Sequence, residues 1–349
     1  NAPATTEIYT SDVSSAASDV YKRQTIVRDI DDDPYRKLPQ LTLLRSALPQ
    51  DFTPNLILAS DYAYFDHGDL PQGHRLYNEL GVSYPMTWIW GFLNGQAKYR
   101  QLNYDLEDPI LFRGDLDDTP DVGAPLVNID GGLIFERDMP WKDGSLLHTL
   151  EPRLYYLWAD NEDQRGLPDF DTSELTFGYG QLFRQTRFSG RDRLDDANQV
   201  SVGVTTRIID PGSGLELLNV SAGQIYYFED RDVTLGRQTD EDREGSSAIA
   251  LEAALTPSTE WEFRSSWLWN TDENELDQSY VQMGYHGDAN RIVNLGYSFR
   301  RYRGNDPDLD DISQVDLSTY MPVNDNWSVF FRSLYDLEEE DRINDMVGV

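Results

Sequence analysis

Arginine and phenylalanine residues gather in one stretch of the sequence, within residues 160–196. The residues concerned are Phe183, Arg184, Arg187, Phe188, Arg191, Asp192 and Arg193. A guanidinium group can hold a phosphate or a carboxylate through two parallel hydrogen bonds, so this stretch could bind an anionic ligand or a partner protein. The alternative is a structural loop, in which the arginines pair with neighbouring aspartates and hold the loop in shape. The sequence leaves both interpretations open.

Residues that could carry out catalysis or bind a metal are few. The four histidines are His67, His74, His148 and His286, and the sequence has no cysteine. It contains neither a G-x-S-x-G nucleophile elbow nor a Walker A motif. The acidic runs at residues 115–121 and 306–311 lack the glycine and the final glutamate of an EF-hand loop. We therefore predict no catalytic residue, no metal site and no cofactor.

Charge and composition exclude several classes of protein. The formal net charge of −33 leaves no basic surface for phosphates, so we expect no nucleic acid partner. No window reaches the roughly 18 consecutive apolar residues of a membrane-spanning helix. The chain has 20 Tyr and 8 Trp, the two residues that favour the interface between bilayer and water. A membrane barrel remains compatible with this composition, because its strands alternate apolar and polar residues.

The dominant pattern is an alternation with a period of two. In residues 259–269, Trp261, Phe263 and Trp267 fall on one face of a strand, and Glu262 falls on the other. The same alternation recurs in residues 127–136, 199–208, 281–286 and 293–300. We expect the apolar face to contact lipid and the polar face to line a lumen.

Two groups of residues follow from this assignment. The lipid-facing aromatic girdle is expected to include Trp261, Trp267, Trp269, Trp327 and Tyr335. The lumen is expected to be lined by Gln199, Ser201, Thr205, Glu260, Glu262, Arg264, Asn294 and Arg300. The second group could form a path for a hydrophilic ligand, or it could be an ordinary hydrated face.

Segments with strand character repeat along the chain, and we predict about fifteen of them. They span residues 38–46, 55–66, 74–85, 88–105, 125–138, 146–159, 197–210, 215–229, 245–256, 259–270, 277–287, 290–303, 311–322, 326–336 and 341–349. Tight turns alternate with long acidic loops, which is typical of membrane barrels with short periplasmic turns and long outer loops. The predicted fold is therefore all-β: an antiparallel transmembrane β-barrel. Residues 56–65 fit the alternation poorly.

The predicted strand number also bears on domain organisation. Bacterial single-chain barrels have even strand numbers, so about fifteen strands indicate part of a larger barrel. We expect residues 25–349 to form this partial barrel. Residues 1–24 are small and polar, and we expect them to be a non-native or disordered leader. The alternative fold is a soluble β-sandwich, which would have to bury many Tyr and Trp side chains whose polar groups need partners.

Several runs of sequence resemble the barrel domain of the LptD family, in the same order and at the expected spacing. They are LPQ at 38–40, LLHTLEPRLYYLW at 146–158, GQLFRQTRFSGRDRLDDANQVSVG at 180–203, TTR at 205–207 and GQIYYF at 223–228. The EPRLYY run and the arginine-rich run after it are fairly specific, and the others are common in barrels. The resemblance covers roughly residues 25–349.

The resemblance implies a very large barrel that is fused to a periplasmic jelly-roll domain and plugged by the lipoprotein LptE. In this family lipopolysaccharide arrives along a periplasmic bridge and enters the outer leaflet through a seam between the first and last strands. The implied role is therefore non-enzymatic insertion of lipopolysaccharide into the outer leaflet of the Gram-negative outer membrane. A general outer-membrane porin or receptor is the alternative.

The implied partners are an LptE-like plug lipoprotein, a periplasmic bridge protein reached through the jelly-roll domain, lipopolysaccharide and the outer membrane. We expect the jelly-roll domain, the first strands, the cysteine pair and the final strands of the family pattern to lie outside this sequence. The seam would then lie outside it as well.

Overall fold

The computed structural model describes residues 5–10, 35–46, 50–68, 70–107, 118–141, 144–236, 238–239, 241–302, 311–324 and 326–349. Within them the chain forms seventeen strands. They are β1 (Thr5–Thr10), β2 (Arg36–Ser46), β3 (Asn55–Asp66), β4 (Gln72–Trp88), β5 (Gly91–Glu107), β6 (Asp121–Leu133), β7 (Phe135–Trp141), β8 (Gly144–Ala159), β9 (Ala197–Ile209), β10 (Glu216–Tyr227), β11 (Ile249–Ser258), β12 (Trp261–Asn270), β13 (Glu275–Gly287), β14 (Arg291–Arg300), β15 (Ile312–Asn324), β16 (Trp327–Asp336) and β17 (Asp341–Gly348). No helix in the described part of the chain is long and apolar enough to cross a membrane.

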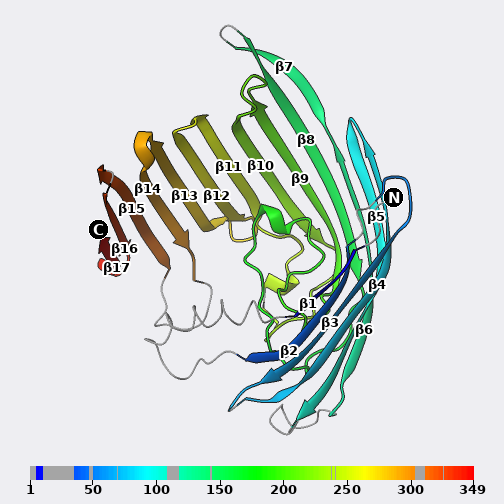
Figure 1. Cartoon of the computed structure of the whole chain (residues 1–349). Coiled ribbons are helices and arrows are strands. Elements are labelled where there is room, and N and C mark those ends of the chain that lie inside the picture. The colour runs from blue at the N-terminus through cyan, green and yellow to red at the C-terminus, as the bar shows by residue number, and fades with distance from the viewer. Residues whose placement is uncertain are drawn as a thin grey trace.

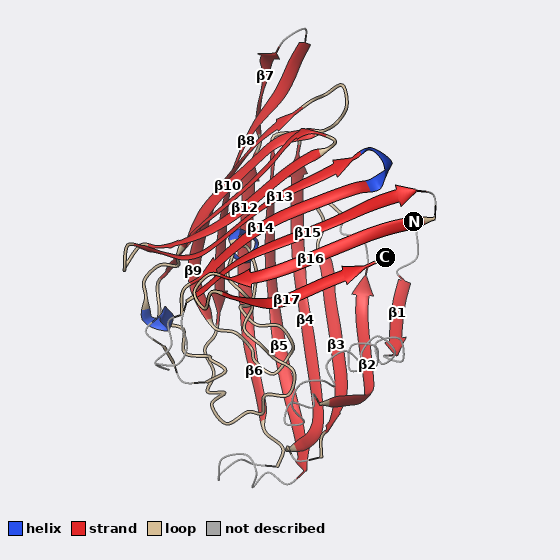
Figure 2. Cartoon of the chain, turned by 90° about the vertical axis from the view of Figure 1, so that its left-hand side faces the viewer, coloured by secondary structure: helices blue, strands red, loops and turns tan. Residues whose placement is uncertain are grey.

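The strands form one curved antiparallel wall. From β1 to β6 and from β8 to β17, each strand pairs with the strand that follows it in the sequence. The long strand β8 pairs with both β6 and β7. Figure 1 shows the wall bending around a hollow, and Figure 2 shows β12–β17 and β3–β6 on different sides of it. This is the partial antiparallel β-barrel that the alternation predicts.

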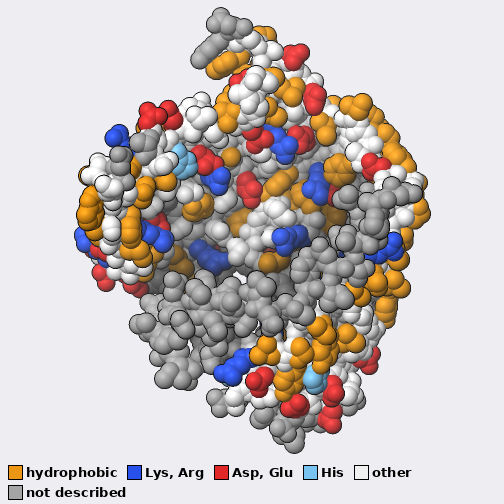
Figure 3. All heavy atoms as spheres, in the orientation of Figure 1, with side chains coloured by type: hydrophobic (Ala, Val, Ile, Leu, Met, Phe, Trp, Pro, Cys, Tyr) orange, Lys and Arg blue, Asp and Glu red, His pale blue; other side chains and the backbone are white. Residues whose placement is uncertain are grey.

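The outer face of the wall is apolar. In β9, Val202 and Val204 are 45% and 38% exposed, whereas Ser201 and Thr205 are buried. Phe263 and Tyr297, on β12 and β14, are exposed to a similar degree. Hydrophobic side chains lie along the outer margin of the wall, and charged side chains are found in the hollow (Figure 3). A soluble sandwich would bury these aromatic residues, so the inward-packed alternative is wrong.

The inner face of β3–β6 departs from the expected polar lining. Phe65, Leu102 and Tyr104 point inward and are buried in a cluster with Phe170 and Leu194 of residues 160–196. The inner face is therefore dry wherever this loop covers it. This explains the poor alternation of residues 56–65: the strand is apolar outward, at Leu56 and Leu58, and apolar inward as well.

The predicted strand at 125–138 is wrong as a single element. The structure divides it at Ile134 into β6 and β7. The neighbouring strand β5 begins at Gly91, level with Leu133, so the chain loses its partner on that side and continues against β8 alone. Figures 1 and 2 both show the β7–β8 hairpin standing above the neighbouring strand ends.

Some expectations concern residues that the structure does not describe. Apart from the backbone of β1, residues 1–24 lie outside the described ranges, as do residues 108–117 and 303–310 of the two acidic runs.

Candidate functional site

The loop that connects β8 to β9, residues 160–196, lies inside the hollow of the wall (Figure 1). Two clusters of ion pairs and one aromatic contact attach it to the inner face. The loop is 37 residues long and has almost no regular secondary structure. Loops of this length in a compact fold are usually functional.

The first cluster is centred on Asp192, whose side chain is fully buried. Its Oδ2 atom accepts hydrogen bonds from the backbone N–H groups of Phe170 and Asp171, at 2.9 and 2.8 Å, and from the Thr172 hydroxyl at 3.0 Å. Its Oδ1 atom accepts from the Tyr104 hydroxyl at 3.0 Å. A buried carboxylate needs this many hydrogen-bond donors, because burying an unpaired carboxylate has a large desolvation free energy.

The cation of this cluster is Arg75 on β4, which is 1% exposed. Its guanidinium donates to Asp192 at 2.6 Å and to both carboxylate oxygens of Asp171, and it lies 4.7 Å above the Phe65 ring. Lys37 reaches Asp171 at 2.7 Å from β2. Burial alone would raise the pKa of Asp171, but hydrogen bonds and attraction from Arg75 and Lys37 outweigh it and hold that pKa well below its usual range.

The low pKa of Asp171 predicts the pH range over which the loop stays attached. A carboxyl with a depressed folded-state pKa contributes its stability in full above the unfolded pKa of about 3.9, and loses it as the pH falls toward the folded value. The difference in unfolding free energy between the native protein and Asp171→Asn should therefore be constant from neutral pH down to about pH 5 and shrink below about pH 4. Denaturant unfolding at a series of pH values measures it. A difference that shrinks between pH 7 and 5 would contradict the assignment.

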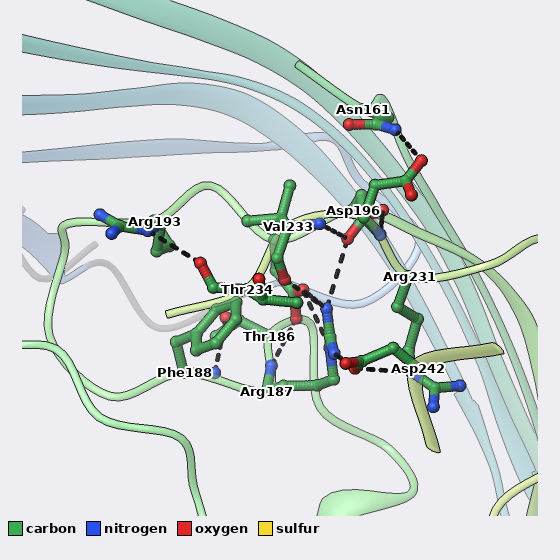
Figure 4. A network of polar contacts seen from close by, with 12 residues as sticks. Asn161, Thr186, Arg187, Phe188, Arg193, Asp196, Arg231, Val233, Thr234 and Asp242 are labelled. Carbon is green, nitrogen blue, oxygen red and sulfur yellow. Dashed lines mark hydrogen bonds and ion pairs between the residues drawn. The ribbon is translucent and has the colours of Figure 1, made fainter. Parts of the chain in front are cut away.

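The second cluster is centred on Arg187 (Figure 4). Its guanidinium donates to Asp195 at 3.0 Å, to Asp196 and Asp242 at 3.3 Å each, and to the carbonyl oxygen of Val233 at 2.9 Å. Burial would lower the pKa of Arg187, but Asp195 and Asp196 more than offset it and raise that pKa. Asp242 and Val233 belong to the next long loop, between β10 and β11, so Arg187 joins the two loops.

The pKa of Asp196 is raised, chiefly by burial and further by its neighbour Asp195. The backbone N–H groups of Asp232 and Val233 donate to Asp196 at 2.7 and 3.2 Å and oppose this rise. The second cluster therefore holds a carboxylate by backbone amides as well as by Arg187.

The aromatic contact involves Phe183 and Arg153, the arginine of the EPRLYY run. Arg153 lies 4.0 Å above the Phe183 ring and donates to both oxygens of Asp130 on β6, at 2.8 and 2.6 Å. Phe183 rests on Gly203 of β9, where a Cβ atom would lie 2.7 Å from its ring. Gly203 faces Gly223 across the strands, so two glycines make room for the loop.

Replacing Gly203 with valine should push Phe183 out of this contact. An added Cβ would also meet the Tyr179 hydroxyl at 3.0 Å, so the loop must move to accommodate the side chain. Overpacking of this kind typically costs about 1–3 kcal/mol. We expect a lower unfolding midpoint in denaturant and faster proteolysis within residues 160–196. Val204→Ile, on the outer face of the same strand, is the control; equal effects from both variants would contradict the packing described here.

The remaining arginines and Phe188 of the candidate loop have different environments. Phe188 is buried. Arg191 lies 4.4 Å above the Tyr77 ring, and Arg193 donates to the carbonyl oxygens of Pro168 and Asp192 at 2.8 and 2.9 Å. Arg184 is exposed and makes no side-chain hydrogen bond, ion pair or ring contact within the described part of the chain. Most of the predicted loop residues therefore hold the loop, whereas Arg184 does not contribute to this through its guanidinium.

A cavity of about 420 Å³ separates this loop from the wall at β10–β14. Arg184, Arg187 and Phe188 of the loop line it together with Gln199 and Arg300 of the predicted lumen-lining set. Arg300 also has no ion pair among the described residues, whereas Arg187 is paired. The cavity thus brings together two guanidinium groups, those of Arg184 and Arg300, that form no ion pair with the described residues.

The other predicted lumen-lining residues divide into two groups. Ser201 and Thr205 face inward but are buried under the loop, where the Thr205 hydroxyl contacts Tyr179 and Ser221. The rest lie near the short-turn ends of β12 and β14. Arg264 pairs with Glu262 on β12, Asn294 donates to Ser318 at 3.3 Å, and Glu260 lies in the turn before β12.

The predicted girdle residues lie on the outer face. Trp261, Trp267 and Trp269 share one face of β12 and are 37%, 37% and 42% exposed. On β16, Trp327 is exposed and Tyr335 is half-buried on the same face. Trp261 and Trp269 mark the two ends of the apolar stretch of their strand, as two interfacial belts would require.

Sequence reasoning missed the wall residues that bind the loop: Arg75, Tyr104 and Arg153. Arg75 carried one signal in the sequence, because it is a charged residue at an inward position of a strand. His74 precedes it, and apolar Leu76 and Tyr77 follow it. Its partners lie about a hundred residues further on, and no local pattern identifies them. In the described residues no group of three or more His, Asp or Glu side chains is placed to hold a metal ion.

A curved antiparallel wall with an apolar outer face and a loop folded into its interior defines a partial β-barrel. The family model described as LPS transport system D matches residues 6–327. The chain therefore belongs to the LptD family.

Similar curated proteins carry the name LPS-assembly protein LptD. The protein of Hahella chejuensis is 33% identical over 348 residues, which is 96% of this chain and 42% of the relative. That of Saccharophagus degradans is 34% identical over 93% of this chain and 40% of the relative. That of Pseudomonas aeruginosa is 36% identical over 76% of this chain and 32% of the relative. The chain spans about two fifths of the length of the first two relatives.

Proposed function

We propose that this chain is part of the barrel wall of a lipopolysaccharide translocon, which inserts lipopolysaccharide into the outer leaflet of the Gram-negative outer membrane. The observation that carries this proposal is the division of the wall into an apolar outer face and a loop-bearing inner face, in a chain of the LptD family. The relatives are named for the assembly of the same lipid. The role is that of a conduit, without a catalytic step.

The proposal includes partners and placement. An LptE-like lipoprotein would occupy the hollow beside the loop, and a periplasmic bridge protein would deliver lipopolysaccharide through a jelly-roll domain. Residues 25–349 would form the barrel segment in the outer membrane. The apolar outer face supports the membrane placement, because a contiguous exposed apolar surface of this kind is unstable in water.

Within this function, the cavity beside Arg184 and Arg300 is the proposed contact for the plug or for the sugar-phosphate part of lipopolysaccharide. Arg184→Ala, made in the protein that the gene encodes, should reduce co-purification of the plug lipoprotein or weaken the outer-membrane barrier. The fold should stay intact, because the Arg184 side chain is exposed and makes no hydrogen bond or ion pair with the described residues. Arg165→Ala, another exposed arginine of the same loop, is the control.

Arg193→Ala should also weaken assembly, but partly by loosening the loop, since Arg193 binds loop carbonyls. If Arg184→Ala leaves both co-purification and barrier function unchanged, the contact proposed for this cavity is wrong.

Depletion of the gene separates this function from the porin or receptor alternative. Loss of newly made lipopolysaccharide from the cell surface, measured by surface labelling, supports the translocon. Altered solute uptake with normal surface lipopolysaccharide supports a porin. The family membership and the loop that fills much of the described inner face favour the translocon.

A further inference from the structure

An arginine at the short-turn rim of the wall faces outward, toward the surroundings of the barrel. Arg137 lies on β7 opposite His148 of β8, and His148 lies opposite Ile208 of β9. Cross-strand partners share a face. Ile208 belongs to the outer row of β9 with Val202 and Val204, so Arg137 and His148 are on the outer face as well.

The neighbouring turns show where the Arg137–His148 pair lies along the length of the strands. The Ile134 N–H donates to the carbonyl oxygen of Trp90 at 2.8 Å, so β7 begins where the β4–β5 turn lies. On the other side, Ile209 ends β9 opposite Leu147. The Arg137–His148 pair therefore lies at the short-turn end of the wall, level with the end of β9 and three residues beyond Ile134 at the β4–β5 turn. In a membrane barrel the short turns lie on the periplasmic side.

A series of three hydrogen bonds connects the Arg137 guanidinium to the backbone of β8. Arg137 Nε donates to His148 Nδ1 at 2.8 Å, and His148 Nε2 lies 2.8 Å from Thr206 Oγ1. Thr206 Oγ1 donates to the carbonyl oxygen of Thr149 at 2.9 Å, so it accepts from His148. The series has one consistent direction when His148 Nδ1 accepts and His148 Nε2 donates. Among the described residues only Nε of Arg137 donates a hydrogen bond, so its two terminal nitrogens stay available.

The surroundings combine apolar surface with an unopposed positive charge. Leu133, Phe135 and Leu150 lie on the same outer face beside Arg137 and are 42%, 55% and 46% exposed. Arg137 forms no ion pair with a carboxylate in the described part of the chain. Glu136 and Asp138, its neighbours in β7, alternate onto the opposite face.

We propose that Arg137, positioned by His148, binds the phosphate of a phospholipid headgroup in the periplasmic leaflet. The two free terminal nitrogens suit two phosphate oxygens, and Phe135 and Leu150 suit the acyl chains above the phosphate. Charge complementarity selects an anionic phospholipid, since no carboxylate of the described residues pairs with the guanidinium. The inference rests on the proposed placement of the chain in the outer membrane.

The test uses the protein that the gene encodes, purified with its partners and reconstituted into phosphatidylcholine bilayers with or without phosphatidylglycerol. Native mass spectrometry measures the phosphatidylglycerol retained after extraction into detergent. Arg137→Gln should reduce retention roughly tenfold, the loss expected for one charge-assisted contact. His148→Phe should reduce it less, because Arg137 remains but loses its support. His148→Gln, which keeps an acceptor for Nε, should restore most of it.

Arg291→Gln is the matched control. Arg291 begins β14 on the outer face and at the same end of the wall, but no side chain of the described residues accepts a hydrogen bond from it. Equal losses from Arg137→Gln and Arg291→Gln would mean general attraction to rim cations and would overturn the inference. Displacement of the lipid by inorganic phosphate alone would overturn the lipid assignment. A native protein that inserts and delivers lipopolysaccharide but retains no phosphatidylglycerol would refute only this site; a protein that does not insert would refute the proposed function.

Discussion

Replacing Asp192 with alanine is expected to destabilise the protein more than any other single change in the loop. Asp192 accepts hydrogen bonds from both backbone and side chains and pairs with Arg75, and both partners of the pair are buried. The variant would leave Arg75 with fewer counter-charges in a dry environment. Removing one partner of a buried ion pair typically costs about 3–5 kcal/mol.

Denaturant unfolding of the detergent-solubilised protein, followed by tryptophan fluorescence, measures this loss. Limited proteolysis should at the same time show cleavage within residues 160–196, because the loop leaves the wall. Asp163→Ala is the matched control, since Asp163 lies in the same loop and is exposed. A variant at Asp192 that unfolds at the same denaturant concentration as Asp163→Ala would contradict the central place of Asp192.

Replacing Trp267 with arginine should be the most damaging change on the outer face. Trp267 lies near the middle of the apolar stretch of β12, with Phe263 and Trp269 on the same face. An arginine on the lipid face of a barrel costs about 2–4 kcal/mol near the bilayer midplane and much less at the interfaces. We therefore expect a lower unfolding free energy and less folded protein in the outer membrane.

The adjacent residue supplies the control for this variant. Ser266 belongs to the same strand but faces inward, so Ser266→Arg should cost much less. Heat-modifiable migration on gels and the denaturation midpoint in lipid vesicles report both effects. Equal damage from the two variants would show that the two faces of β12 do not differ in their surroundings.

The wall could be predicted from the sequence because its cause is local. Alternation with a period of two fixes which side chains share a face, and Val202, Phe263, Trp267 and Tyr297 all lie on the exposed outer face as the pattern predicts. The break at Ile134 could not be predicted in this way. It depends on where a different strand, β5, begins, and nothing in residues 125–138 encodes that position.

The loop could be located from its composition, but the roles of its arginines could not be assigned. Arg187 and Arg184 are three residues apart in the same run of sequence, yet one is held by three aspartates and the other is free. Their partners come from another loop and from the wall, which only the folded chain brings together. The apolar inner face of β3 is missed for the same reason, because it is complementary to Phe170 and Leu194 of the distant loop.

Spin-label accessibility along β9 and β12 tests the membrane placement most directly. Single cysteines would be introduced at Val202, Val204, Phe263 and Trp267, and at the inward positions Glu262 and Arg264, in a background lacking other reactive cysteines. In reconstituted bilayers, labels at the four outer positions should collide mainly with lipid-soluble oxygen, and labels at the two inward positions with a water-soluble nickel chelate. Labels at the outer positions that favour the nickel chelate, or that show no alternation along the strand, would contradict the membrane assignment and the lipopolysaccharide function proposed from it.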